Sequence, residues 1–490
     1  MPLPLEPFAS IPLDEPLLRH LLARHDARAA HLGKLWRYYR NPGVSLGEGR
    51  VRLAQECGLP PRLTGRWNPL DDDRFSTERE IVIENDIAWR IHTLVDFLAG
   101  RPVSILSAAP DERRRAEIQS LLDAVFEASG GGALLQDAAL LASVYGHVDL
   151  LIRADALFEP ARAGSPSIAR ALSRAGAVRL EPLEPTRAVP LVNPHDFRRL
   201  DAMILRYQRE AHEVERVSPV RRLLSRRAEA PAPGSRRMIE VIEVHSADAW
   251  RRFEDEALVA EGAHRLGEVP VVHIQNIAQP FSWEGLSDVE PLIPLQDELN
   301  TRLSDRANRV TMQAFRMYLA RGVDGFADAP IGPGQVFSTD NPDASIEVIG
   351  ADAPSPSEEA HIEGLREALD KASSVTPIAA GVLRAGVGQL SSENALRVTL
   401  LGALAKTARK QATFGRALAH ASRLILRAFD EAGVYRTTEQ ERAVRIVWPE
   451  PVPATERERL DGARARAELG VPRERVLASI GESPADPGVE

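Results

Sequence analysis

The sequence has little cysteine, few aromatic residues and no long apolar run, and each shortage excludes a class of protein. Cys57 is the only cysteine among 490 residues, which excludes an intramolecular disulfide framework and fits a reducing cytoplasm. Aromatic residues make up 5%, too few for a groove that stacks on sugars or bases. No eighteen consecutive apolar residues occur, and Glu6, Asp14 and Glu15 lie near the N-terminus. We therefore expect neither a transmembrane helix nor a signal peptide, and no membrane partner.

The sequence also lacks an excess of positive charge, since 61 lysines and arginines stand against 70 aspartates and glutamates. The formal net charge is −9 and the pI is near 5.8. Proteins that wrap DNA tightly carry a basic excess, because neutralisation of phosphates dominates their affinity. Any DNA contact of this chain is therefore expected to be loose or confined to a small part of the surface.

The common catalytic motifs are absent. The twelve histidines are scattered without His-Glu-x-x-His spacing, Cys57 lacks local signs of activation, and no Gly-x-Ser-x-Gly elbow occurs. Gly33-Lys34 lacks the upstream glycine of a phosphate loop. The triplet Gly130–Gly132 follows a predicted helix, which favours an interhelical turn over a phosphate cradle. Asp71–Asp73 is interpreted as a charged loop, with a divalent-ion site as the less favoured alternative. We predict no catalytic, cofactor-binding or metal-binding residues.

The sequence pattern predicts an α+β protein that is mainly helical. In the first half, apolar spacing and capping residues predict helices over 16–40, from Asn85 to Gly100, over 111–129 and over 133–144. Short strands follow between about 176 and 275, with Met203–Tyr207 and Met238–His245 as the clearest antiparallel pair. The arginine-rich segment 216–237 between them is expected to form an exposed hairpin tip, and its role is left open.

Helices dominate the second half. Ser287 and Glu290 form a capping-box pattern before a helix whose apolar stripe runs from Leu295 to Met317, roughly 35 Å long. Ser355, Pro356 and Glu358 predict another capped helix start. A glycine-punctuated linker, 376–391, then leads into a helix that runs to Asp430. A strand over 444–448 and short helices are expected in the tail.

The two helices that flank the linker carry opposite charge. The first is acidic through Glu358, Glu359, Glu363, Glu367 and Asp370. The second has no acid between Asn394 and Phe429, and its cations project to one side. Those cations are Lys406, Arg409, Lys410, Arg416, Arg423 and Arg427. Three interpretations stay open for this basic stripe: contact with DNA, contact with a neighbouring subunit, or a solvated face.

Several segments, in this order, resemble the portal proteins of tailed bacteriophages, in the branch widespread among long-tailed phages. The segments are "LGKLWRYYRN", "IENDIAWRIHTLVDFLAGRPV", "LLQDAALLASVYGHVDLLIR", "LGEVPVVHIQNIAQPFSWEGLSDVEPLIPLQDELNTRLSDRANR" and "SSVTPIAAGVLRAGVGQLSSENALRVTLLGALAKTARKQ". The fourth is the closest match, and it includes Asn276 in a loop before the first stem helix. Each motif alone has low specificity, so the resemblance depends on their order and spacing.

The resemblance implies a portal fold. Its parts would be a wing (1–285), a first stem helix (286–319), a clip (320–354), a second stem helix (355–375), a tunnel loop (376–391), a long helix (392–432) and a crown-like C-terminal region (433–490). The residues of the tunnel loop expected to face DNA are Gly381, Arg384, Gly386, Gly388 and Gln389.

The resemblance also implies a structural role in the virion. Such subunits form a cyclic ring, commonly of twelve, at one capsid vertex, and are assembled in the bacterial host cytoplasm. Double-stranded DNA would pass through the ring without sequence specificity during packaging and ejection. Terminase and head-completion or adaptor proteins would dock on the clip side, with the major capsid and scaffold proteins as further partners. The chain itself would not be an enzyme.

Two alternatives come from other classes. A DNA-packaging or processing enzyme, such as a terminase or nuclease, would need a phosphate loop or a metal-binding carboxylate cluster. Another phage head or adaptor protein, or a host helical scaffold, would share the amphipathic helices without forming an open-channelled ring. Stoichiometry separates this second alternative from a portal ring.

Overall fold

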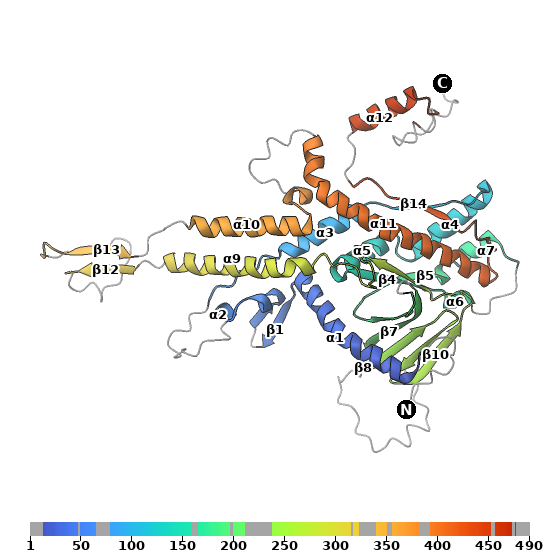
Figure 1. Ribbon diagram of the computed structural model, residues 1–490, viewed down its shortest axis with the longest axis horizontal. Coiled ribbons are helices and arrows are strands. Elements are labelled where there is room, and N and C mark those ends of the chain that lie inside the picture. Colours follow the sequence, from blue (N-terminus) through green and yellow to red (C-terminus); the bar gives the residue numbers. More distant parts are fainter. Residues whose placement is uncertain are drawn as a thin grey trace, which may run out of the picture.

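The computed structural model describes residues 13–47, 50–64, 79–158, 165–196, 199–210, 238–314, 317–322, 340–349, 355–381, 393–451, 456–472 and 476. The fold is α+β and mainly helical, as predicted. Figure 1 shows an elongated molecule, in which two helices project side by side from a larger body and a β-ribbon lies beyond their outer ends. The projecting helices are α9 (Ile293–Ala314) and α10 (Pro356–Ser373), and the ribbon pairs β12 (Met317–Arg321) with β13 (Ser345–Ile349).

The body contains a three-stranded antiparallel sheet covered by helices. Its order is β11–β4–β5, with bounds Val271–Gln275, His147–Arg153 and Arg179–Leu183. The helices of this part are α3 (Asp86–Ala99), α4 (Glu112–Ala128), α5 (Gly132–Tyr145), α6 (Asp155–Phe158) and α7 (Ile168–Ser173). The long helix α11 (Glu393–Glu431) runs along the body and buries Phe414, Leu418, Ile425 and Phe429 in the same core (Figure 1). Two distant segments, β3 (Ser104–Ser107) and β14 (Val444–Val447), pair beside α11.

A second sheet of five antiparallel strands lies against α1 (Glu15–Arg40). Its order is β10–β9–β8–β7–β6, with bounds Ala257–Ala263, Ala249–Glu254, Met238–His245, Leu200–Glu210 and Ala188–Val192. The predicted pairing of Met203–Tyr207 with Met238–His245 is confirmed, since Met203 lies opposite His245 and Tyr207 opposite Val241. The predicted hairpin tip 216–237 lies outside the described residues.

The remaining described elements are short. They are the antiparallel pair β1 (Gly43–Gly47) and β2 (Arg50–Leu53), α2 (Pro61–Thr64) and the C-terminal α12 (Glu456–Glu468). Short 3-10 turns also occur, over Ala54–Gly58, Ala175–Ala177, Glu290–Leu292 and Pro377–Ala380. Within the part of the chain that the structure describes, no helix combines the length and apolar character needed to cross a membrane.

The structure differs from the sequence prediction at both ends of the projecting pair. The stripe predicted to reach Met317 stops earlier, because α9 ends at Ala314 and Met317 pairs with Ile349 in the β12–β13 ribbon. Periodicity along one segment cannot reveal a partner strand that lies thirty residues further on. Ser355 is the N-cap of α10, but its side chain makes no capping bond. Glu358, the other member of the predicted box, forms an ion pair with Arg309 of α9 instead.

Helix α9 also carries a polar ladder that binds the segment leading into α3. Four side chains of α9, spaced four residues apart, each accept one hydrogen bond from a backbone N–H of the segment 80–86. The N–H groups that donate belong to every second residue of that segment. The pairs are Gln296 with Asp86 at 3.1 Å, Asn300 with Glu84 at 3.0 Å, Ser304 with Val82 at 3.0 Å and Asn308 with Glu80 at 3.0 Å. Four helical residues rise about 6.0 Å and two extended residues about 6.6 Å, so the two repeats nearly coincide.

Two of these side chains also donate to the carbonyls of the same segment, which makes the contact reciprocal. Gln296 donates to the carbonyl of Glu84 and Asn308 to the carbonyl of Glu80. The single hydroxyl hydrogen of Ser304 has its closer acceptor, at 2.8 Å, in the carbonyl of Asn300 on α9 itself. Asn300 is fully buried and donates to Gln55 Oε1 at 3.1 Å. Side chains of α9 therefore give this segment the hydrogen bonds that a neighbouring strand gives in a sheet.

We predict a graded response when the ladder is cut. Asn300→Leu removes the acceptor of the Glu84 N–H and the donor to Gln55 Oε1, and these lost bonds cost about 2–3 kcal/mol of local opening free energy. Asn308→Leu, at the solvent-exposed end, should cost less than about 1 kcal/mol because water replaces the lost bonds. Hydrogen exchange of residues 80–86, followed by mass spectrometry, measures both. Equal acceleration by the two variants would show that the ladder does not hold this segment.

The buried His147 gives the β4–β11 region a pH dependence. Burial lowers the pKa of His147 to about 3. Arg28 Nη2 lies 3.0 Å from His147 Nε2, and because a guanidinium only donates, this ring nitrogen is an acceptor in a neutral imidazole. The folded pKa of this histidine lies below its unfolded value of about 6.5. The fold around it therefore loses stability as the pH falls from the unfolded pKa towards the folded pKa.

Between pH 6.5 and pH 5, His147 should therefore remove about 2 kcal/mol from the local stability of β4. In His147→Gln, whose amide oxygen can accept from Arg28, this part of the pH dependence should disappear. The measurement is hydrogen exchange of β4, comparing variant and parent at each pH. His195→Gln, at an exposed histidine, is the control and should retain the parent slope. Parallel slopes for His147→Gln and its parent would contradict the assignment.

Candidate functional site

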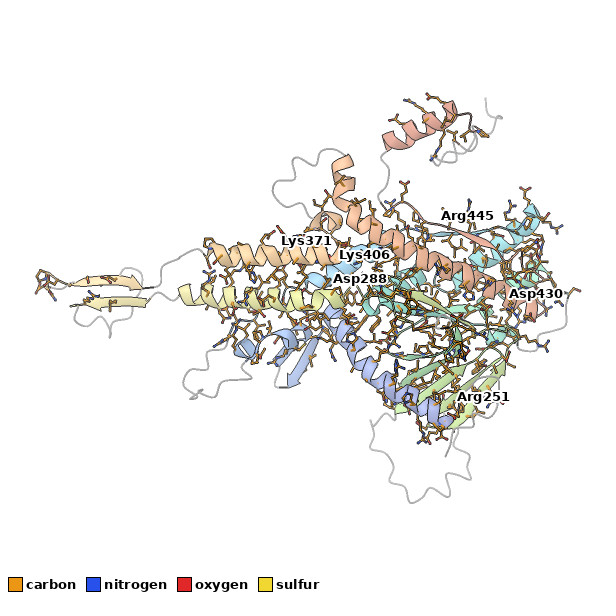
Figure 2. The ribbon with its side chains drawn as sticks, in the orientation of Figure 1. Arg251, Asp288, Lys371, Lys406, Asp430 and Arg445 are labelled. Carbon is orange, nitrogen blue, oxygen red and sulfur yellow. The ribbon has the colours of Figure 1, made fainter. Side chains whose placement is uncertain are left out.

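A buried ion cluster lies where the α9–α10 pair meets the body. Asp288 is held between two lysines of α11, with Oδ1 2.7 Å from Lys406 Nζ and Oδ2 2.6 Å from Lys410 Nζ. The lysines are four residues apart and therefore share one face of the helix. Asp288 is 2% exposed, Lys410 is 0% exposed and Lys406 is 6% exposed. In Figure 2, Asp288 and Lys406 lie close together at the inner end of the projecting helices.

Local hydrogen bonds fix Asp288 in place. Ser287 Oγ accepts from the N–H groups of Val289 and Glu290, which is one half of the predicted capping box. The Glu290 carboxylate lies 3.3 Å from His31 Nε2 of α1. The Asp288 N–H donates to the carbonyl of Ser143 at the end of α5. Asn276 Nδ2 donates to Asp288 Oδ2 at 2.9 Å. Its own turn and two other segments therefore orient the carboxylate independently of the two lysines.

The electrostatics favour the charged form of Asp288. Burial alone would raise its pKa, but the ammonium groups of Lys410 and Lys406 hold the pKa of this carboxyl well below its usual range. Burial lowers the pKa of Lys410, and the carboxylate of Asp288 opposes that shift. Two cations thus share one anion in a dry site, and polar groups of the chain satisfy their remaining donors.

Those remaining donors connect the cluster to other helices. Lys406 Nζ donates to the carbonyl of Ser373, the last residue of α10, at 2.9 Å. Lys410 Nζ donates to Ser143 Oγ of α5 at 2.8 Å. The cluster therefore joins α5, α10, α11 and the turn before α9 at one point.

Arg90 of α3 forms a second buried contact with the end of α10. Its side chain is 1% exposed, and Nη1 donates to Asp370 Oδ1 and to the carbonyl of Val375, both at 2.7 Å. Nη2 donates to Asp86 Oδ2 at 3.1 Å. A cation at a helix C-terminus is stabilised by the helix dipole and by the free carbonyls there.

Arg90 and Lys406 together form a rigid base for the segment that follows α10. The chain leaves α10 at Ser374, which has positive φ, and forms the short turn η5 (Pro377–Ala380) before Gly381. Gly381 has φ of 78°, a conformation that glycine adopts at little cost. We name Asp288, Lys406, Lys410 and Arg90 the loop anchor, because they fix both sides of the point where segment 376–391 begins.

The loop anchor changes the interpretation of two predicted site residues. Lys406 and Lys410 do not lie on an exposed basic face, because both are buried against Asp288. A helical projection gives the direction of a side chain but not the element that packs there. Arg423 and Arg427 face Glu268, at 4.0 Å and 3.7 Å, and His420 lies 2.9 Å from the same carboxylate. Arg409 and Arg416 are exposed, and their contact with DNA or with a neighbouring subunit stays a prediction.

The acidic residues of α10 also divide into two groups. Glu359 forms an ion pair with Arg306 of α9 at 3.0 Å, and Asp370 binds Arg90, so both act within the subunit. Glu363 and Glu367 lie on the exposed face of α10, where Glu367 is 3.8 Å from Lys371. Of the predicted tunnel-loop residues, Gly381 is described, and Arg384, Gly386, Gly388 and Gln389 lie outside the described residues.

Comparison with known proteins identifies one family. The sequence model of the family described as phage portal protein, SPP1 Gp6-like, matches residues 174–481. The match includes α9, α10, α11 and Asp288 with both of its lysines. No curated protein sequence matches the chain. Among the described residues, no three His, Cys, Asp or Glu side chains are grouped so that they could hold a metal ion.

We predict that Asp288→Asn is far more harmful than Lys410→Met. Removing the carboxylate leaves two buried lysines without an anion, at a cost of about 3–5 kcal/mol, whereas removing Lys410 leaves a neutral Lys406–Asp288 pair. The double variant Asp288→Asn/Lys410→Met should regain part of the loss, because one uncompensated charge is gone. The double-mutant cycle is measured by denaturant unfolding, with hydrogen exchange of α11 as the probe. Strictly additive effects would contradict the shared-anion arrangement.

Proposed function

We propose that this chain, which belongs to the family of SPP1 Gp6-like phage portal proteins, forms a cyclic ring at one vertex of a tailed-phage capsid. The family assignment rests on a match over residues 174–481, and members of this family are structural. In the proposed ring, double-stranded DNA passes through the central channel during packaging and ejection. The chain supplies no ATP hydrolysis, which comes from the terminase motor.

The shape and the charge of the subunit support this assembly. Projecting helices beside a broad body give the subunit two different sides, and a head-to-tail contact between different sides closes into a ring when the rotation permits. The ion pairs Arg306–Glu359 and Arg309–Glu358 join α9 to α10, so the pair can act as one rigid strut. A net charge of −9 disfavours tight adhesion of DNA to the channel wall.

The loop anchor is the observation that carries the proposed role of segment 376–391. A segment that touches moving DNA needs freedom at its tip and a fixed position at its base. Arg90 and Lys406 hold the carbonyls at the end of α10, and Lys410 holds α11 to the same point. We assign Arg384 a transient phosphate contact at the tip, and Arg409 and Arg416 a contact with DNA or with the next subunit.

The proposed parts follow the order of the elements. Residues 1–285 form the wing, 286–319 and 355–375 the stem, and 320–354 the clip, where terminase and later the head-completion proteins dock. Residues 376–391 form the tunnel loop, 392–432 the long helix and 433–490 the crown-like region. We propose twelve subunits in the ring, contacts of the wing with the major capsid and scaffold proteins, and assembly in the bacterial host cytoplasm.

Negative-stain electron microscopy of the purified protein tests the ring. We expect particles with a central hole, and a uniform monomer at high concentration would overturn the proposal. Deletion of Gly381–Gly388 tests the loop separately. The deleted protein should still form rings but should no longer support DNA packaging, because the anchor remains and only the tip is lost. Normal packaging with the deletion would remove the tunnel-loop assignment and leave the ring standing.

A further inference from the structure

A small cavity lies where the five-stranded sheet meets the body of the molecule. Asp155 and Phe158 of α6 line it from the body, and His245 of β8 and Trp250 of β9 line it from the sheet. His264, the residue after β10, lines it as well. Figure 1 shows α6 beside β10 at this edge, and the two elements are in contact. A molecule bound in the cavity therefore connects the sheet to the body.

The size of the cavity decides what class of molecule fits. Its volume is about 10 Å³. One water molecule needs about 10–15 Å³, whereas a cavity that holds benzene measures about 150 Å³. An organic ligand and a chain of waters are therefore excluded. A single buried water is retained only where two or more polar groups bind it, so the polar lining decides whether this cavity holds one.

Two ionisable residues of the lining are already bound to a buried carboxylate. Arg153 Nη1 donates to Glu243 Oε2 at 3.0 Å, and Arg153 Nε donates to Glu181 Oε2 at 2.5 Å. His245 Nε2 lies 3.3 Å from the same Glu243 oxygen, and Glu243 is 0% exposed. The ionisable side chains of the lining that remain are those of Asp155 and His264.

The imidazole of His264 needs a hydrogen-bond donor. The residue is 7% exposed, and neither ring nitrogen makes a hydrogen bond of good geometry with a described residue. Burial lowers the pKa of His264 to about 4, although the nearby carbonyl of Ser246 favours the protonated ring. The ring is therefore neutral at pH 7, with one N–H and one lone pair. The Ser246 carbonyl serves the N–H at most, so the nitrogen with the lone pair is left in a buried site without a donor.

The carboxylate of Asp155 has the same need. Burial raises its pKa, although His245 and Arg153 oppose the shift. A buried carboxylate whose pKa is raised has too few donors around it. The cavity is thus lined by two acceptors, a ring nitrogen and a carboxylate, which repel each other unless a donor lies between them. Water is the smallest molecule that donates in two directions.

We propose that the cavity binds one structural water, which donates one hydrogen to the ring nitrogen of His264 and the other to the carboxylate of Asp155. Asp155 is the first residue of α6 and His264 follows β10, so the water ties the outer strand of the five-stranded sheet to the body. This site involves neither DNA nor a neighbouring subunit. It therefore stands or falls separately from the portal function.

A density map of the full-length protein, at a resolution that shows ordered water, tests the site directly. We expect one peak within about 3.2 Å of both a ring nitrogen of His264 and a carboxylate oxygen of Asp155. In His264→Phe, whose ring has a similar size but no acceptor, the peak should be lost. No peak in the parent protein, or a peak that contacts neither residue, would overturn the proposal. A peak that persists unchanged in His264→Phe would do so as well.

Hydrogen exchange of residues 257–264 tests whether the water ties the sheet to the body. The His264 N–H, which donates to the carbonyl of Asp248 at 2.7 Å, belongs to this stretch. Asp155→Leu removes the acceptor and should accelerate exchange about fivefold. Asp155→Asn is the matched control, because it removes the same charge but keeps an oxygen that accepts from water, and it should accelerate exchange by less than about twofold. Equal acceleration by the two variants would show that the charge of Asp155 matters and the water does not, which would overturn the proposal.

Discussion

The pairing of Asp288 with two lysines of α11 is the constraint on which the centre of the molecule depends. A charge removed from water must be matched closely, because an unpaired buried ion costs several kcal/mol. One carboxylate serving two ammonium groups leaves donors to spare, and those donors bind α10 and α5. The positions of four elements therefore depend on a single anion. A shift of α11 along its axis would separate Lys406 and Lys410 from Asp288 and leave buried charges unpaired.

Much of the fold could be predicted from the sequence, where the signals are local. Asp14 and Asn85 accept from the first turns of α1 and α3, and Asn41 and Gly146 take the left-handed conformation at helix ends. The antiparallel partnership of β7 and β8 followed from two β-prone runs on either side of one connecting segment. Caps and turns depend on neighbours in the chain, so a single sequence carries that information.

The candidate site could be predicted only in part, because its energetics depend on partners far away in the chain. The sequence placed Lys406, Lys410, Arg423 and Arg427 together on one side of a helix, but their acids, Asp288 and Glu268, lie more than a hundred residues earlier. Arg90 lay inside a predicted helix without any sign that it would reach the end of α10. One missed feature did have a signal. Gln296, Asn300, Ser304 and Asn308 repeat every four residues beside the apolar stripe, and polar residues so placed need partners.

The polar ladder of α9 can have only a limited number of side chains. The helix advances about 6.0 Å per rung and the bound segment about 6.6 Å, so the mismatch grows to about 1.8 Å over three intervals. A hydrogen bond tolerates a displacement of donor from acceptor of only a few tenths of an ångström. Rotation of the side chains absorbs part of the remaining mismatch, and the ladder ends where it no longer can. The four side chains of the ladder can therefore all reach their backbone partners in only one alignment of α9 with residues 80–86. An axial pull on α9 must break all the rungs together or carry residues 80–86 and α3 along with it.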